Sequence, residues 1–183
     1  TVAPVDAEHV REGVPLAGIR LVHVTARPVE TPQGLFLEIS GGESLTVMES
    51  LESLASDRGT LFDASQLAHA FPDVACVLLQ PPRRPTLDLT PAGRETCAWL
   101  RVVGASLAEQ GVPLVIVLPP MDGELAAHLV RLLGRRAPDL RPGAEFDAHE
   151  FTMRARELVI DYAQRLLSRD AAIELALQVV VYG

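Results

Sequence analysis

Three continuous apolar runs constrain the fold of this chain more than any other feature. Their sequences are GIRLVHVT over 18–25, VACVLLQ over 74–80 and VPLVIVLP over 112–119. Strands that are apolar throughout, rather than at every second residue, are typical of parallel sheets covered on both faces. Segments with helical spacing separate the runs. The sequence therefore predicts an α/β fold with a mostly parallel central sheet and helices on both faces.

Capping residues predict where the helices before the third run begin. A short helix is expected over 62–71, with Asp63 as its N-cap and Pro72 ending it. A longer helix is expected from about 91 to 110, because Thr90 is a favoured N-cap and proline is favoured as the first helical residue. Gly111 is expected to close this helix.

The last third of the chain predicts two more helices and a strand. We expect helices over 122–136 and 147–169, each beginning at an aspartate, and a final strand over 172–183, AIELALQVVVYG. The middle of the chain stays open: Gly41-Gly42 favours a hairpin between short runs, whereas the apolar spacing over 43–56 favours a helix. Residues 1–17 are expected to be an arm or linker before one domain, 18–183.

The charge balance narrows the classes of function. The chain of 183 residues has a net charge of −8 and 16 basic residues, all of them arginine. An acidic protein of this kind is not expected to bind nucleic acid, and the absence of lysine excludes lysine-based chemistry such as Schiff-base formation. No apolar run reaches the length of a membrane span and no signal peptide is evident. We therefore expect a cytoplasmic protein with no membrane contact.

The carboxyl ends of the three predicted strands are where an α/β protein would hold a ligand. No glycine-rich turn follows any of them, and prolines, which offer no N–H, stand there instead. The five histidines are scattered without ligand spacing, so neither a metal nor a cofactor is expected. The candidate binding residues at these ends are Arg27, Gln80, Arg83, Arg84 and Asp122. The arginines could form a pocket for an acidic peptide or a phosphate, or they could be ordinary solvated loop charges.

His23 and Cys76 are the remaining candidates for catalysis. Both lie within apolar strands, where a side chain faces a helix layer, so we interpret them as core residues. The alternative is an active cysteine peptidase in which these two side chains form a dyad. Cys97 lies within a predicted helix and is expected to pack in the core.

The order of segments resembles the CHAT domain, a caspase-like peptidase family. The resemblance is carried by GIRLVHVTARP, GLFLEI, TLFDASQLAHAFPDVACVLLQPP, EQGVPLVIVLPPMDGELAAHLVRLL and the closing VVVYG, and it covers roughly 18–183. It implies a three-layer caspase-like sandwich. Strands that usually precede the first run in this family would have to lie on a missing segment or on a partner chain that completes the sheet.

The resemblance also implies where catalytic residues would lie, and this chain departs from the family there. His23 matches the first, structural histidine of the family motif, but the second histidine falls on Arg27 and the nucleophilic cysteine falls near Pro81, or on Gln80 if the register slips by one. Arginine stays protonated and cannot act as a base, and proline has no nucleophile. The expectation is an inactive peptidase-like module that binds a protein or peptide in a bacterial signalling or defence assembly. A flavodoxin-like module that binds a small ligand is the other alternative.

Overall fold

The computed structural model describes residues 2–4, 21–39, 60–82, 90–120, 128–129, 131 and 147–183. Within them the chain forms two sheets. The larger contains, in spatial order, β1 (Val2–Pro4), β2 (Leu21–Thr25), β6 (Cys76–Gln80), β7 (Val115–Val117) and β8 (Val180–Tyr182). The smaller is antiparallel and contains β3 (Arg27–Thr31), β4 (Gly34–Ile39) and β5 (Thr60–Phe62). The helices are α2 (Ala64–Ala70), α3 (Pro91–Glu109), α5 (Ala148–Ala163) and α6 (Arg169–Ala176).

The larger sheet is mostly parallel, as the three apolar runs predict. Strands β1, β2, β6 and β7 are parallel to one another, and β8 is antiparallel to β7. The runs over 18–25, 74–80 and 112–119 supply β2, β6 and β7, the three inner strands. The prediction of a mixed α/β fold around a mostly parallel sheet is therefore confirmed.

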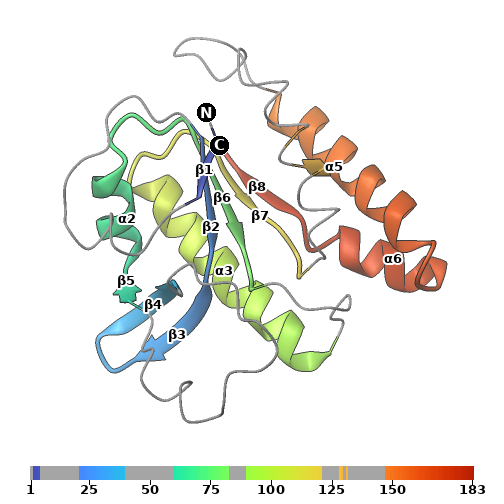
Figure 1. Ribbon diagram of the computed structural model, residues 1–183, viewed down its shortest axis with the longest axis horizontal. Coiled ribbons are helices and arrows are strands. Elements are labelled where there is room, and N and C mark those ends of the chain that lie inside the picture. The colour runs from blue at the N-terminus through green and yellow to red at the C-terminus, as the bar shows by residue number, and fades with distance from the viewer. Residues whose placement is uncertain are drawn as a thin grey trace.

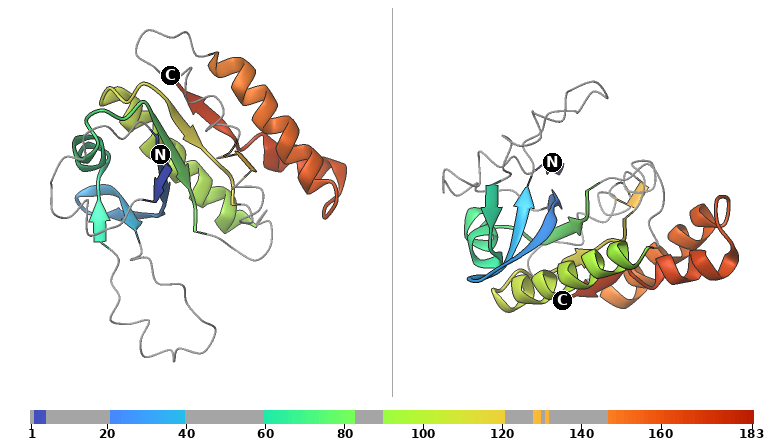
Figure 2. Two further views of the ribbon diagram at one scale, coloured as in Figure 1. Left: turned by 45° about the horizontal axis from the view of Figure 1, so that its top comes forward. Right: turned by 90° about the horizontal axis from the view of Figure 1, so that it is seen from below.

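The core has two parts, and alternate residues of the strands belong to different parts. In β6, Val77 and Leu79 pack in a cluster that includes residues of α2 and α3. Cys76 and Leu78 pack in a second cluster with residues of α5 and α6. All five residues of β6 are buried, which explains why this run is apolar throughout. Figures 1 and 2 show α3 lying along the sheet and α5 and α6 adjoining each other.

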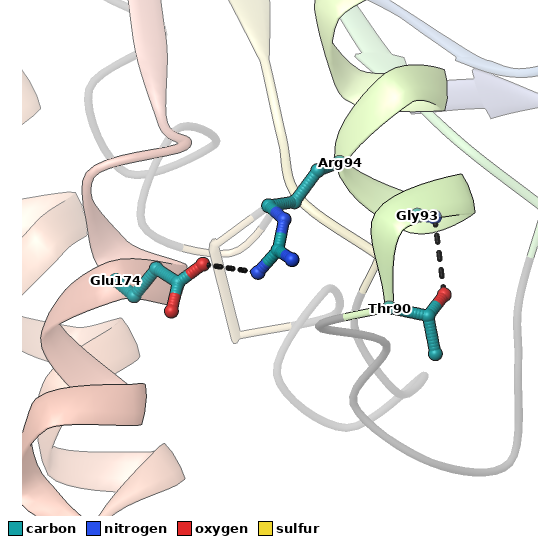
Figure 3. Close-up of polar contacts among 4 residues, drawn as sticks. All are labelled: Thr90, Gly93, Arg94 and Glu174. Atoms are coloured by element: carbon teal, nitrogen blue, oxygen red, sulfur yellow. Dashed lines mark hydrogen bonds and ion pairs between the residues drawn. The ribbon is translucent and has the colours of Figure 1, made fainter.

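Helix α3 begins where the sequence predicts and is connected to α6. The Thr90 hydroxyl accepts a hydrogen bond from the Gly93 amide (3.2 Å), and Pro91 is the first helical residue. One turn later the Arg94 guanidinium contacts the Glu174 carboxylate of α6 (2.7 Å; Figure 3). Further along α3, Nη2 of Arg101 donates to the carbonyl of Leu177 (3.4 Å). These contacts hold α6 beside α3.

Helix α2 is also confirmed, with a reciprocal cap at its start. The Asp63 carboxylate accepts from the Gln66 amide (2.7 Å), and the Gln66 side chain accepts from the Asp63 amide (3.0 Å). Of the helix predicted over 122–136, only residues 128, 129 and 131 are described, and they are helical. The segment 43–56, where a hairpin and a helix were both open, lies outside the described residues.

The end of the chain differs from the prediction. A single helix over 147–169 is wrong, because α5 ends at Ala163 and a new helix, α6, begins after the Ser168 cap, whose hydroxyl accepts from the Ala171 amide (3.3 Å). Residues 172–176, expected in the final strand, belong to α6, and the strand itself is only Val180–Tyr182. The physical reason is burial: Ala172, Leu175 and Ala176 keep helical spacing and face the core.

Two further segments were not predicted as strands. Residues 27–31 form β3 and pair with β4 across a tight turn at Pro32-Gln33, where Gly34 has a positive φ of 135°. Val2–Pro4, expected within an arm, form β1 and pair with Leu21–His23 at the edge of the larger sheet. Figure 1 shows the smaller sheet beyond the carboxyl end of β2, with the two chain ends toward the opposite end of the larger sheet.

Candidate functional site

The carboxyl ends of β2 and β6 lie side by side. The two strands pair in parallel from Leu21 with Cys76 to Thr25 with Gln80. The pairing continues one residue further, because the Ala26 amide donates to the Gln80 carbonyl (3.0 Å). Arg27 and Pro81 therefore both follow directly from neighbouring strand ends.

Arg27 lies in a strand rather than in a loop. It is the first residue of β3 and stands opposite Glu38 of β4. Nε of Arg27 donates to Oε2 of Glu38 (2.8 Å), and 65% of the arginine side chain is exposed, against 21% for Glu38. The guanidinium is thus held by one carboxylate and still open to solvent at the sheet end. A fixed cation at this position can bind an anion, but it cannot accept a proton.

A partly buried polar pair joins β2 to β6 near their carboxyl ends. Nε2 of His23 donates to Oε1 of Gln80 (2.9 Å), and only 1% of Gln80 is exposed. The Nε2 atom of Gln80 is buried and has no hydrogen-bond partner among the described residues. Pro81, which follows, is buried as well. The pair joins β2 to β6 on the face of the sheet that Cys76 also occupies, since His23, Gln80 and Cys76 keep the two-residue period of strands that pair in register.

The geometry separates Cys76 from His23. Cys76 stands opposite Leu21, whereas the residue opposite His23 is Leu78. The Cys76 side chain is fully buried in the apolar cluster around α5 and α6, and this desolvation raises the pKa of its thiol to about 12. The thiol is therefore protonated at neutral pH, and it is the thiolate that attacks a carbonyl. Cys97 is also free and buried, in α3.

Among the described residues, the strand ends carry no other group suited to binding a phosphate or a metal ion. Pro119 and Pro120, which follow β7, are buried and carry no amide that could bind a phosphate. Within the described ranges, no cluster of three or more His, Cys, Asp or Glu side chains could hold a metal ion. Arg83, Arg84 and Asp122, the other predicted binding residues, lie outside the described residues.

Two side-chain contacts at this site were not predicted from the sequence. Glu38 ends the alternating segment GLFLE, whose charged terminal residue marks it as part of a strand with one exposed face. Once β3 is recognised as the first arm of a hairpin, Arg27 and Glu38 fall opposite each other. The hydrogen bond between His23 and Gln80 follows in the same way from the β2–β6 register, which strand prediction alone does not supply.

In the described part of the chain, no helix is long and apolar enough to cross a membrane. Comparison with known proteins adds no relative: no protein-family model, no curated protein and no solved structure matches this chain.

Proposed function

We propose that this chain is a catalytically inactive, caspase-like module of the CHAT type that binds a protein or peptide partner, in the setting of a bacterial signalling or defence assembly. One observation carries the proposal. Arg27 and Pro81 follow neighbouring parallel strands at the point where Thr25 pairs with Gln80. These are the two positions at which the resemblance expects a catalytic histidine and a catalytic cysteine.

The side chains at this site support the binding of a partner rather than the cleavage of a peptide. Arg27 is paired with Glu38 and stays protonated, so it cannot activate a nucleophile. Pro81 offers no nucleophile, and the thiol of Cys76 is buried with a raised pKa. What the site offers a partner is an exposed guanidinium, which suits the carboxylate of an acidic peptide.

A labelling experiment on the native protein tests the absence of catalysis. We expect iodoacetamide and peptidyl ketone probes to leave Cys76 unmodified at pH 7.5 while the protein is folded, and to modify both cysteines in about 6 M guanidinium. A library of fluorogenic peptides is expected to show no turnover. Turnover that disappears in Cys76→Ser would contradict the proposal and favour the active peptidase.

A binding experiment tests the positive half of the proposal. Fluorescent acidic peptides should bind the wild-type chain more tightly than basic peptides of the same length do, and Arg27→Ala should weaken this binding by about tenfold. Arg154→Ala is the matched control, because Arg154 is also an exposed arginine in one ion pair, with Glu150 of α5. Equal effects of the two substitutions would show that Arg27 is not part of a binding site.

A further inference from the structure

We propose a second binding site, at the edge of the larger sheet, where a basic peptide in extended conformation adds a strand to β8 and inserts side chains between β8 and α3. This groove is distinct from the Arg27 site. It lies where α3 ends and β7 begins, at the amino ends of the parallel strands, whereas Arg27 follows their carboxyl ends. The inference does not depend on the peptidase resemblance.

Strand β8 lies at one edge of the larger sheet. It is the last strand of the larger sheet, and among the described strands it pairs only with β7. An edge strand presents unpaired N–H and C=O groups along its outer side, which are a template for another extended chain.

The register identifies which residue presents those groups. The backbone groups of Leu114 and Leu118 bond to β6, so those of Val115 and Val117, which alternate with them, face β8. The partners of Val115 and Val117 are the residues on either side of Val181. The N–H and C=O of Val181 therefore point away from the sheet, and in the described part of the chain no hydrogen bond accounts for them.

The backbone groups of Val179, at the start of this edge, already have hydrogen-bond partners. The carbonyl of Val179 accepts from Nη2 of Arg156 (2.9 Å), and its amide donates to the carbonyl of Ala176 (3.1 Å). The Arg156 side chain and the Ala176 carbonyl thus satisfy Val179 at the start of the edge, and no described group does the same for Val181. One residue of an incoming strand could exchange two hydrogen bonds with Val181.

A groove lies beside this edge. This open surface groove has a volume of about 670 Å³ and is lined by Ala105 and Ala108 of α3, by Pro113, and by Val181 and Tyr182 of β8. Its lining is mostly small and apolar, so it has room for side chains from a partner. Because successive side chains of a strand alternate in direction, every second residue of an added strand would enter the groove.

The charge beside the groove favours a basic peptide. Glu109, at the last turn of α3, is the one charged side chain among the described residues that line the groove, and it is exposed. The whole chain has a net charge of −8. A lysine or arginine next to the inserted apolar residues is therefore the favourable complement.

The test uses the full chain labelled with ¹⁵N and capped heptapeptides of alternating valine and threonine, with both end residues lysine, glutamine or glutamate. We expect the lysine-ended peptide, at up to about 1 mM, to shift the Val181 amide resonance saturably. Methylation of the alternate peptide nitrogens that would face β8 should weaken binding at least about tenfold, because it removes the donors of the added strand.

Substitutions in α3 test the charge argument without touching the core. Glu109→Lys should weaken binding of the lysine-ended peptide at least about fivefold, while Glu95→Lys, an exposed position near the start of the same helix, should leave it within about twofold. Four results would overturn the proposal. Three of them are no shift at Val181 with any of the peptides, equal binding of the methylated peptide, and equal binding of the glutamate-ended and lysine-ended peptides. The fourth is a concentration-dependent shift of Val181 without peptide, which would assign the edge to a second copy of this chain.

Discussion

Burial of the Cys76 thiol links the stability of this protein to alkaline pH. The pKa of the thiol is raised from 9.0 to about 12 because desolvation disfavours the thiolate. Between these values the unfolded chain loses a proton that the folded chain keeps, so rising pH favours unfolding. The stabilising contribution is complete below about pH 8 and falls by up to about 1.4 kcal/mol per pH unit above pH 9.

Cys76→Ala isolates this effect, because every other titrating group is retained. Between pH 7 and pH 10, the free energy of unfolding of the wild type should fall by about 1.4 kcal/mol more than that of the variant. Urea denaturation at a series of pH values measures the difference. Parallel pH profiles for the two proteins would mean that the thiol is hydrated in the folded state.

A single glycine determines how closely α3 approaches the sheet. A Cβ added to Gly104 would lie 2.9 Å from Cγ2 of Val117 and 3.0 Å from Cε2 of Tyr182. Neither neighbour can move freely, since Val117 is fully buried and the Tyr182 hydroxyl donates to the Arg101 carbonyl (3.0 Å). The contact of α3 with β7 and β8 thus depends on the missing side chain.

Gly104→Ala should therefore destabilise the protein, although alanine favours a helix by about 1 kcal/mol over glycine. Overpacking costs about 1–3 kcal/mol, so we expect a net loss of up to about 2 kcal/mol in urea denaturation. Ala98→Gly, at an exposed position of α3, measures the helix preference alone. A Gly104→Ala variant more stable than the wild type would show that the sheet yields to the added methyl group.

Elements with strong local signals could be predicted from the sequence, and those that depend on tertiary pairing could not. The caps at Asp63 and Thr90 are local and located α2 and α3 correctly. Strand β3 begins with Arg27-Pro28 and is only partly buried, so it lacks an apolar pattern and forms because β4 pairs with it. The apolar run that ends the chain has both helical and strand spacing. Its first part forms the helix α6 because that part is buried against α5.

At the scale of the whole molecule, the burial of the apolar runs determines the architecture. The register in which the strands pair determines which residues meet at the site. Continuous apolar runs have to be covered on both faces, and this requirement was enough to predict the inner strands of the sheet. Which strand ends meet is a different question, because it depends on the pairing of β2 with β6. The strand-end rule put Arg27 and Gln80 at the same end of the sheet, and the resemblance added that Arg27 and Pro81 stand at the positions of a catalytic pair.

The two proposed sites differ in their charge and in their position on the larger sheet. An exposed arginine lies at the carboxyl ends of the strands, and an open strand edge with a glutamate beside it lies toward their amino ends. A partner with both acidic and basic segments could engage both, and each site can be disabled without the other, by Arg27→Ala or by Glu109→Lys.

The central claim is that Arg27 and Pro81 occupy the positions of a lost catalytic pair, and the most direct measurement is the reactivity of a thiol placed there. In the double variant Arg27→His with Pro81→Cys, made with Cys76 and Cys97 replaced by alanine, the rate of alkylation by iodoacetamide is followed against pH. We expect the introduced thiol to titrate at least about one pH unit below the same thiol in the Arg27→Ala, Pro81→Cys variant of the same background, because an imidazolium at position 27 stabilises the thiolate whereas alanine carries no charge. Titration of the thiol at the same pH in the two variants would contradict the claim that the two positions form one site.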